Sequence, residues 1–183
     1  EGEFDMPYEI ANQRIAHVIA DSPVPIGYWR SVGHSHNAFF KESFIDELAL
    51  GFGKQFVVVA IDTNNINGKN YVHLNGGRIA TSIETEAWVK EAEERGAGEI
   101  LLTSMDHDGT KAGFDNELLK KINDNLGIPL IASGGAGNIQ DFIDVFQLTN
   151  ADAALAASVF HYGEILIPDL KLKLRENNIE VRL

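Results

Sequence analysis

The sequence has 183 residues, with 15 basic and 27 acidic side chains and a net charge of −12 at neutral pH. A charge of this sign repels nucleic-acid phosphates and anionic membrane surfaces, so we expect neither as a partner. The hydrophobic content of 44% is enough to bury one good core, and the length fits a single domain better than two.

Cysteine is absent, so no disulfide framework points to an oxidising compartment, and a cytoplasmic protein is expected. No apolar run approaches the roughly 20 residues of a membrane helix, and the acidic start of the chain is unlike a signal peptide. The first residue is Glu1 rather than Met, which indicates a processed chain or a piece of a longer one.

Residues 1–54 have a pattern of their own. A strand is expected at residues 14–20, a proline-rich loop follows, and residues 37–50 have the apolar spacing of an amphipathic helix. Residues 51–53 are typical of a linker, so we place a domain boundary between residues 54 and 55.

In residues 55–183, apolar β-branched runs alternate with helical patterns. The expected strands lie at residues 56–61, 99–105, 128–132 and 151–157. The expected helices lie at residues 84–95, 116–126, 138–148 and 166–177. Turn signals on either side of residues 71–74 indicate a small hairpin after the first strand.

Successive strand–helix units predict a parallel sheet, because each crossover returns the chain to the same edge. The predicted fold class is therefore α/β, the (βα)4 half of a TIM-type barrel, preceded by a strand, a loop and a helix.

Chemistry in a parallel βα architecture gathers where the strands end. The first two strands run into carboxylates, at Asp62 and Asp108. The last two run into small residues, at 133–135 and at 157–158. The glycine-rich turn before the helix at Asn138 would expose backbone N–H groups, which predicts a phosphate cradle that residues 157–158 close.

Each signal also has an ordinary structural interpretation. A lone Ser-Gly-Gly-Ala-Gly run is more often a tight turn than a phosphate site, and Asp62 alone fits a helix or turn cap equally well. In register with four strands, these signals favour the functional interpretation. His34 and His36 suggest a metal pair, but without further ligands we interpret them as part of a solvated loop, and we expect no metal or cofactor.

Residues 56–183 resemble the cyclase subunit of imidazole glycerol phosphate synthase, an enzyme of histidine biosynthesis. The resemblance rests on the runs VVVAID, GAGEILLTS, DGTK, ASGGAG and ADAALAASVFH and on the ending VRL. It implies a barrel that condenses ammonia with a phosphorylated ribotide to give imidazole glycerol phosphate. It also implies a ligand that carries a phosphate at each end.

Carried over by position, Asp62 resembles one of two catalytic carboxylates and Asp108 a supporting catalytic acid. Thr103 and Ser133 would line the same mouth. Glu99, at the other end of its strand, resembles a remnant of the gate through which ammonia enters from a glutaminase partner. The residues that resemble one of the two phosphate sites are Gly109, Gly134, Gly135, Ala157 and Ser158.

The other catalytic Asp of the family lies on the first strand of the full barrel, which the resembling part lacks. The second phosphate site and the basic residues of the gate are missing with it. We therefore expect a scaffold that binds a phosphate or sugar phosphate without full catalysis and without a bound glutaminase. Two free edges predict a homodimer that closes an eight-stranded barrel, and cyclase activity recovered on this pairing is the alternative.

Residues 7–50 resemble a second family, the large subunit of molybdenum hydroxylases of the aldehyde and isoquinoline oxidoreductase type. The resemblance rests on the run VPIGYWRSVGHSHNAFFKESFIDELA. A segment this short cannot hold the molybdenum cofactor, so no redox activity is expected. The joint predicts a recombined or selected chimera, and a binding module that uses the N-terminal aromatic residues is a second alternative.

Overall fold

A computed structural model describes residues 47, 51, 53 and 56–182. The chain divides into two units, Glu1–Gly53 and Lys54–Leu183. The strand expected at residues 14–20, most of the helix expected at residues 37–50, and both His34 and His36 lie outside the described residues. Gly51, which we placed in a linker, is helical. A single glycine costs a helix only about 1 kcal/mol relative to alanine, so it need not end one.

Six strands of the second unit form one sheet in the order β3-β2-β1-β4-β5-β6. The parallel strands are β1 (Val58–Ile66), β4 (Glu99–Ser104), β5 (Leu130–Ser133) and β6 (Ala153–Leu155). The antiparallel strands on the other side of β1 are β2 (Lys69–Leu74) and β3 (Ile79–Glu84). The expected α/β class is confirmed, and the mostly parallel sheet is consistent with a TIM-barrel-type fold.

The first strand is longer than we expected, and the hairpin after it belongs to the sheet. β1 does not end before Asp62 but continues to Ile66. Asn67 and Gly68, with φ of 56° and 84°, then turn the chain into β2. Two positive φ angles in a two-residue turn match the twist of the flanking strands, so the Asn-Gly pair specifies this hairpin.

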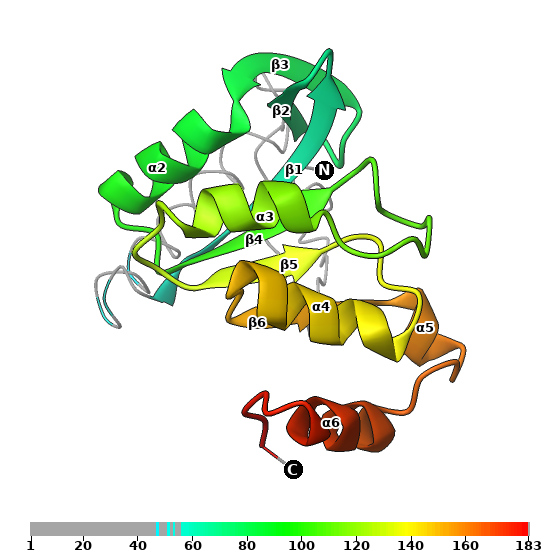
Figure 1. The fold of residues 1–183 in the computed structure, drawn as a ribbon. Helices are drawn as coiled ribbons and strands as arrows, with labels where there is room; N and C mark the ends of the chain where they lie inside the picture. The colour runs from blue at the N-terminus through cyan, green and yellow to red at the C-terminus, as the bar shows by residue number, and fades with distance from the viewer. Residues whose placement is uncertain (1–46, 48–50, 52, 54–55, 183) are drawn as a thin grey trace, which may run out of the picture. The chain divides into compact units, whose positions relative to one another are not determined.

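Three helices cover one face of the sheet (Figure 1): α2 (Thr85–Arg95), α3 (Asn116–Asn123) and α4 (Ile139–Thr149). Beneath them lies the core, built from apolar residues of the helices and from every second residue of the strands. The strand residues under the helices are at most 2% exposed: Ile61, Ile100, Leu102, Leu130 and Ala132. This alternation assigns the remaining strand positions to the opposite face.

Two further helices follow β6, the short α5 (Ser158–His161), which we did not expect, and α6 (Ile167–Glu176). Four residues are too few to show a helical period, which explains the omission of α5. The Phe142 ring packs against Phe160 at 5.7 Å and against Phe114 at 5.5 Å between ring centroids, which ties α4 to α5 and to the loop before α3.

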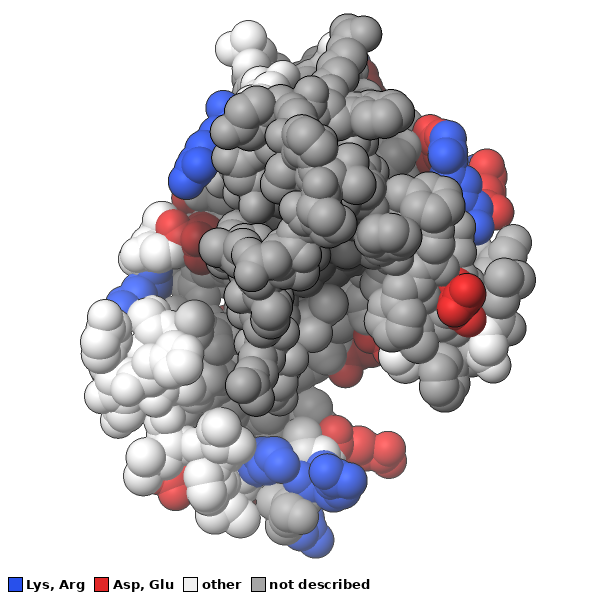
Figure 2. All heavy atoms as spheres, turned by 180° about the vertical axis from the view of Figure 1, so that it is seen from behind, with Lys and Arg blue, Asp and Glu red and all other residues white. Residues whose placement is uncertain are grey.

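Seen from behind, Lys and Arg side chains gather at the lower end of the molecule, where Figure 1 places α6 and the C-terminal residues (Figure 2). Acidic side chains lie beside them in the same view. Among the described residues, no helix has both the length and the apolar character needed to cross a membrane.

Candidate active site

The strand register places the expected mouth residues in one row. Asp62 pairs with Thr103, Thr103 with Ser133, and Ser133 with Leu155. Directly paired residues point to the same face of a sheet. In β1, β4 and β5, the residue before each member of the row is buried under the helices, so the row lies on the opposite face of the sheet. The structure therefore brings together the side chains that we expected at the mouth.

The carboxyl group of Asp62 lies in a mixed electrostatic environment. Burial raises its pKa above the ordinary value of 3.8, the charge of nearby His73 opposes the rise, and the carboxylate of Asp108 adds to it. A hydrogen bond from the backbone N–H of Gly77 lowers the pKa again. Asp62 and Asp108 are thus close enough to influence each other's charge, and a proton on Asp62 is favoured relative to water.

His73 is a site residue that the sequence interpretation missed. It pairs directly with Asp62 across β1 and β2 and is 9% exposed. Its Nδ1 lies 3.0 Å from the carbonyl oxygen of Tyr71. Because a carbonyl oxygen only accepts, Nδ1 is the donor in this contact. The signal was available, since Asp62 and His73 stand equally far on either side of the Asn67-Gly68 turn.

A polar cluster anchors the loop that carries Asp108. The Ser104 hydroxyl donates to Asp115 Oδ2 at 3.3 Å and lies 3.1 Å from His107 Nδ1. The backbone N–H groups of His107 and Asp108 donate to the Ser104 carbonyl at 3.2 and 2.9 Å. Because Asp115 also caps α3 through the N–H of Leu118, the loop is fixed at both ends.

Glycines allow this loop to pack directly on the turn after β5. A Cβ on Gly134 would lie 2.6 Å from the Ser104 carbonyl oxygen, and one on Gly135 would strike the carbonyl of Gly113. The Gly113 N–H in turn donates to the Gly135 carbonyl at 2.9 Å. Gly134 and Gly135 therefore leave room for a neighbouring loop, a role that we had not assigned to them.

The N-terminus of α4 is closed by its own side chains. The N–H groups of Gly137 and Asn138 donate to Asp141 Oδ2 at 2.7 and 3.0 Å. Those of Gln140 and Asp141 donate to Asn138 Oδ1 at 2.8 and 3.4 Å. This capping box satisfies the helix end and places a carboxylate there. The N–H groups that we expected to contribute to a phosphate cradle at this helix end are thus bonded to its own side chains, and the phosphate site stays a prediction.

A cavity of about 230 Å³ nevertheless lies beside the row, between the loops after β4, β5 and β6. All five residues expected at the phosphate site line it, together with Asp108, Lys111 and Ser133. Its size suits one end of a ligand rather than a whole drug-sized molecule. Among the lining residues, the side chains of Lys111, Ser133 and Ser158 carry donors for an anion.

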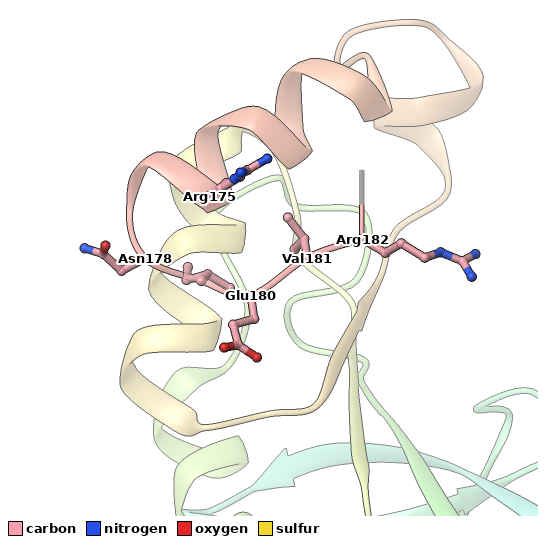
Figure 3. A pocket seen from close by; sticks show the side chains of 6 residues that line it. Arg175, Asn178, Glu180, Val181 and Arg182 are labelled. Atoms are coloured by element: carbon pink, nitrogen blue, oxygen red, sulfur yellow. The ribbon is translucent and has the colours of Figure 1, made fainter.

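A larger cavity of about 640 Å³ lies at the C-terminal end, lined by Arg175 and residues 178–182. Figure 3 shows that its polar side chains diverge: Asn178 and Arg182 point to opposite sides, and Glu180 points away from Arg175. Without convergent polar groups, this hollow lacks the features of a ligand site.

Glu99 does not share the mouth. It begins β4 and pairs with Val58, four residues before Thr103 on the same strand. Within the described part of the chain, no group of three or more His, Cys, Asp or Glu side chains could hold a metal ion.

Three relatives named imidazole glycerol phosphate synthase subunit HisF illustrate what the chain is similar to. It is 57% identical over 152 residues to the protein of Flavobacterium psychrophilum, covering 83% of this chain and 61% of the relative. It is 56% identical over 151 residues to that of Elusimicrobium minutum, covering 82% and 60%. It is 54% identical over 140 residues to that of Bacillus cereus, covering 76% and 56%.

The chain thus spans about three fifths of the length of the curated relatives it matches. A family match starts at residue 27, inside the segment that we expected to be foreign to the rest of the chain. Residues 27–166 match the histidine biosynthesis protein family, and the chain belongs to that family.

Proposed function

We propose that the mouth of this sheet binds the phosphate end of a sugar-phosphate ligand, as part of a barrel of the imidazole glycerol phosphate synthase cyclase type. The observation that carries the proposal is the cavity between the loops after β4, β5 and β6, next to the row of Asp62, Thr103 and Ser133. Its walls include all five residues expected to bind phosphate. The names of the relatives support a phosphorylated ligand for this family.

Ala157 is the best position for a test because it is exposed, lines the cavity and has an ordinary negative φ of −111°. Ala157→Asp places a carboxylate at the cavity wall, and Ala157→Asn is its neutral control of the same shape. We expect phosphate affinity, measured by calorimetry, to fall more than about tenfold in the Asp variant only. Equal phosphate affinities in the two variants would show that phosphate binds elsewhere.

We further propose that this chain alone does not complete the cyclase reaction. Proton transfer at two places of a substrate needs two positioned groups. Asp62 and Asp108 are the carboxylates at the mouth, and the second catalytic carboxylate expected for the family lies outside the described sheet. A turnover assay with added ammonia tests this proposal, because measurable imidazole glycerol phosphate would favour the alternative of recovered activity.

Within the described residues, the edges of the sheet support a homodimer of half-barrels. β6 ends the sheet, and β2 pairs with β1 only from Asp62 onward. On the face opposite the helices, Val58 is 47% exposed and Leu155 is 40% exposed. A second copy would cover these side chains and complete the strand pairing. Light scattering should then give twice the chain mass for the wild type and a smaller mass for Leu155→Lys.

A chimeric origin of residues 7–50 stays a proposal, as does a binding role for that segment. The glutaminase partner of the family is proposed to be lost with the missing gate residues. Removing residues 1–53, the first of the two units, tests the binding role. If the solution mass and the phosphate affinity are unchanged, the removed segment contributes to neither.

A further inference from the structure

The cavity has one cationic side chain among its lining residues, and that side chain is already engaged. Lys111 Nζ lies 2.6 Å from Glu164 Oε1 and 2.7 Å from Glu164 Oε2. Lys111 lies in the loop after β4, whereas Glu164 lies just after α5. The ion pair therefore joins the loop after β4, which lines the cavity, to the segment after α5, across 53 residues of sequence.

The backbone of Lys111 is held firmly in place. Its φ of 57° is in the left-handed region, which non-glycine residues seldom adopt. Gly137 packs against it so closely that a Cβ there would lie 2.8 Å from Lys111 Cβ. Both features fix the point from which the lysine side chain starts, while the side chain itself is 44% exposed and free to change partner.

The charges around the cavity are unfavourable for an anion unless Lys111 is available. Asp108 lines the cavity, Asp141 closes the adjacent helix end, and the whole chain carries −12. The two carboxylate oxygens of Glu164 accept hydrogen bonds from the Lys111 ammonium group, as two oxygens of a phosphate would. A bound phosphate and Glu164 are therefore alternative partners for the same donor.

We propose that Lys111 recognises the anion in this cavity and that Glu164 competes with the anion for Lys111. The inference rests on the proposed phosphate site and adds the side chains that set its affinity. In the empty state the ion pair satisfies the lysine; in the occupied state the ammonium group turns to the phosphate and Glu164 is released to solvent.

Two variants separate competition from simple support of the fold. Lys111→Gln and Glu164→Gln each break the same ion pair, so any effect of losing that pair has the same sign in both. Competition predicts opposite signs instead. Phosphate affinity should fall about five- to tenfold in Lys111→Gln and rise about two- to fivefold in Glu164→Gln. Glu164→Gln should have no further effect when Lys111 is already Gln.

The experiment is a calorimetric titration of the full chain with inorganic phosphate at one fixed ionic strength. Glu86→Gln is the matched control, because Glu86 pairs with Lys121 between α2 and α3 and its loss changes net charge equally. This control should leave the affinity unchanged. If phosphate affinity changes in the same direction in Lys111→Gln and Glu164→Gln, or changes in neither variant, the proposed competition is wrong. A wild type that binds no phosphate overturns the phosphate site itself.

Discussion

Replacing Gly135 by alanine tests the packing of the two loops at the mouth. The backbone φ of 105° is costly for any residue with a Cβ, by about 1–2 kcal/mol. The added methyl group would also strike the carbonyl of Gly113 and lie 3.0 Å from His107 Cβ. Because the first obstacle is backbone, the loop itself must move. We expect a total loss of at least about 3 kcal/mol in unfolding free energy.

Gly109→Ala is the control for this experiment. Gly109 has a φ of 73°, and a Cβ there would meet no atom within 4 Å. Only the cost of the positive φ applies, so the unfolding free energy should fall by about 1 kcal/mol. Thermal unfolding followed by circular dichroism should show a fall of roughly 2–4 °C for each kcal/mol. If Gly135→Ala lowers the midpoint no more than Gly109→Ala, the loop packing described above is incorrect.

Further predictions concern the site and the core. Protonated Asp62 stabilises the fold fully below pH 3.8, and this stabilisation is lost as pH rises through the raised pKa of Asp62. The Asp62→Asn variant should therefore gain stability relative to the wild type over that pH range. Denaturant melts at a series of pH values measure the difference. Phe142→Ala should cost about 3–5 kcal/mol in chemical denaturation, because the ring is 2% exposed, whereas Leu148→Ala, at a 55% exposed position, should change little. Asn138→Ala should remove the capping box and cost about 1 kcal/mol by the same measurement, while Asn138→Asp should retain most of the stability.

The parallel part of the sheet and the mouth row could be predicted because their signals are local and regular. Short β-branched runs followed by helices define the strands, and the position where each run ends predicts which side chains share an edge. Asp62 and Ser133 were expected at strand ends on this basis, and Thr103 was expected beside them from the family resemblance. The strand register puts all three in one row. The antiparallel strand β3 was missed because its Thr and Ser residues interrupt the apolar alternation.

The role of Gly134 and Gly135 could not be predicted from the sequence, because a missing side chain is compatible with two different functions. A glycine at a loop lets an anion approach the backbone, and it also lets another loop approach. Gly134 and Gly135 line the cavity and also contact the loop after β4, so both purposes meet at one turn. The closed end of α4 was predictable, since Asn138 followed three residues later by Asp141 is a capping-box spacing.

The charges at the mouth also link ligand binding to protons. Asp62 and Asp108 repel each other, and a phosphate nearby would add further negative charge to the same region. The mouth can reduce this negative charge by protonating Asp62, whose pKa is already raised. The proton lowers the repulsion of an anion, so by thermodynamic linkage a bound anion must favour the proton on Asp62 in return. We therefore expect Asp62, which is partly buried, to take up a proton when the site binds phosphate.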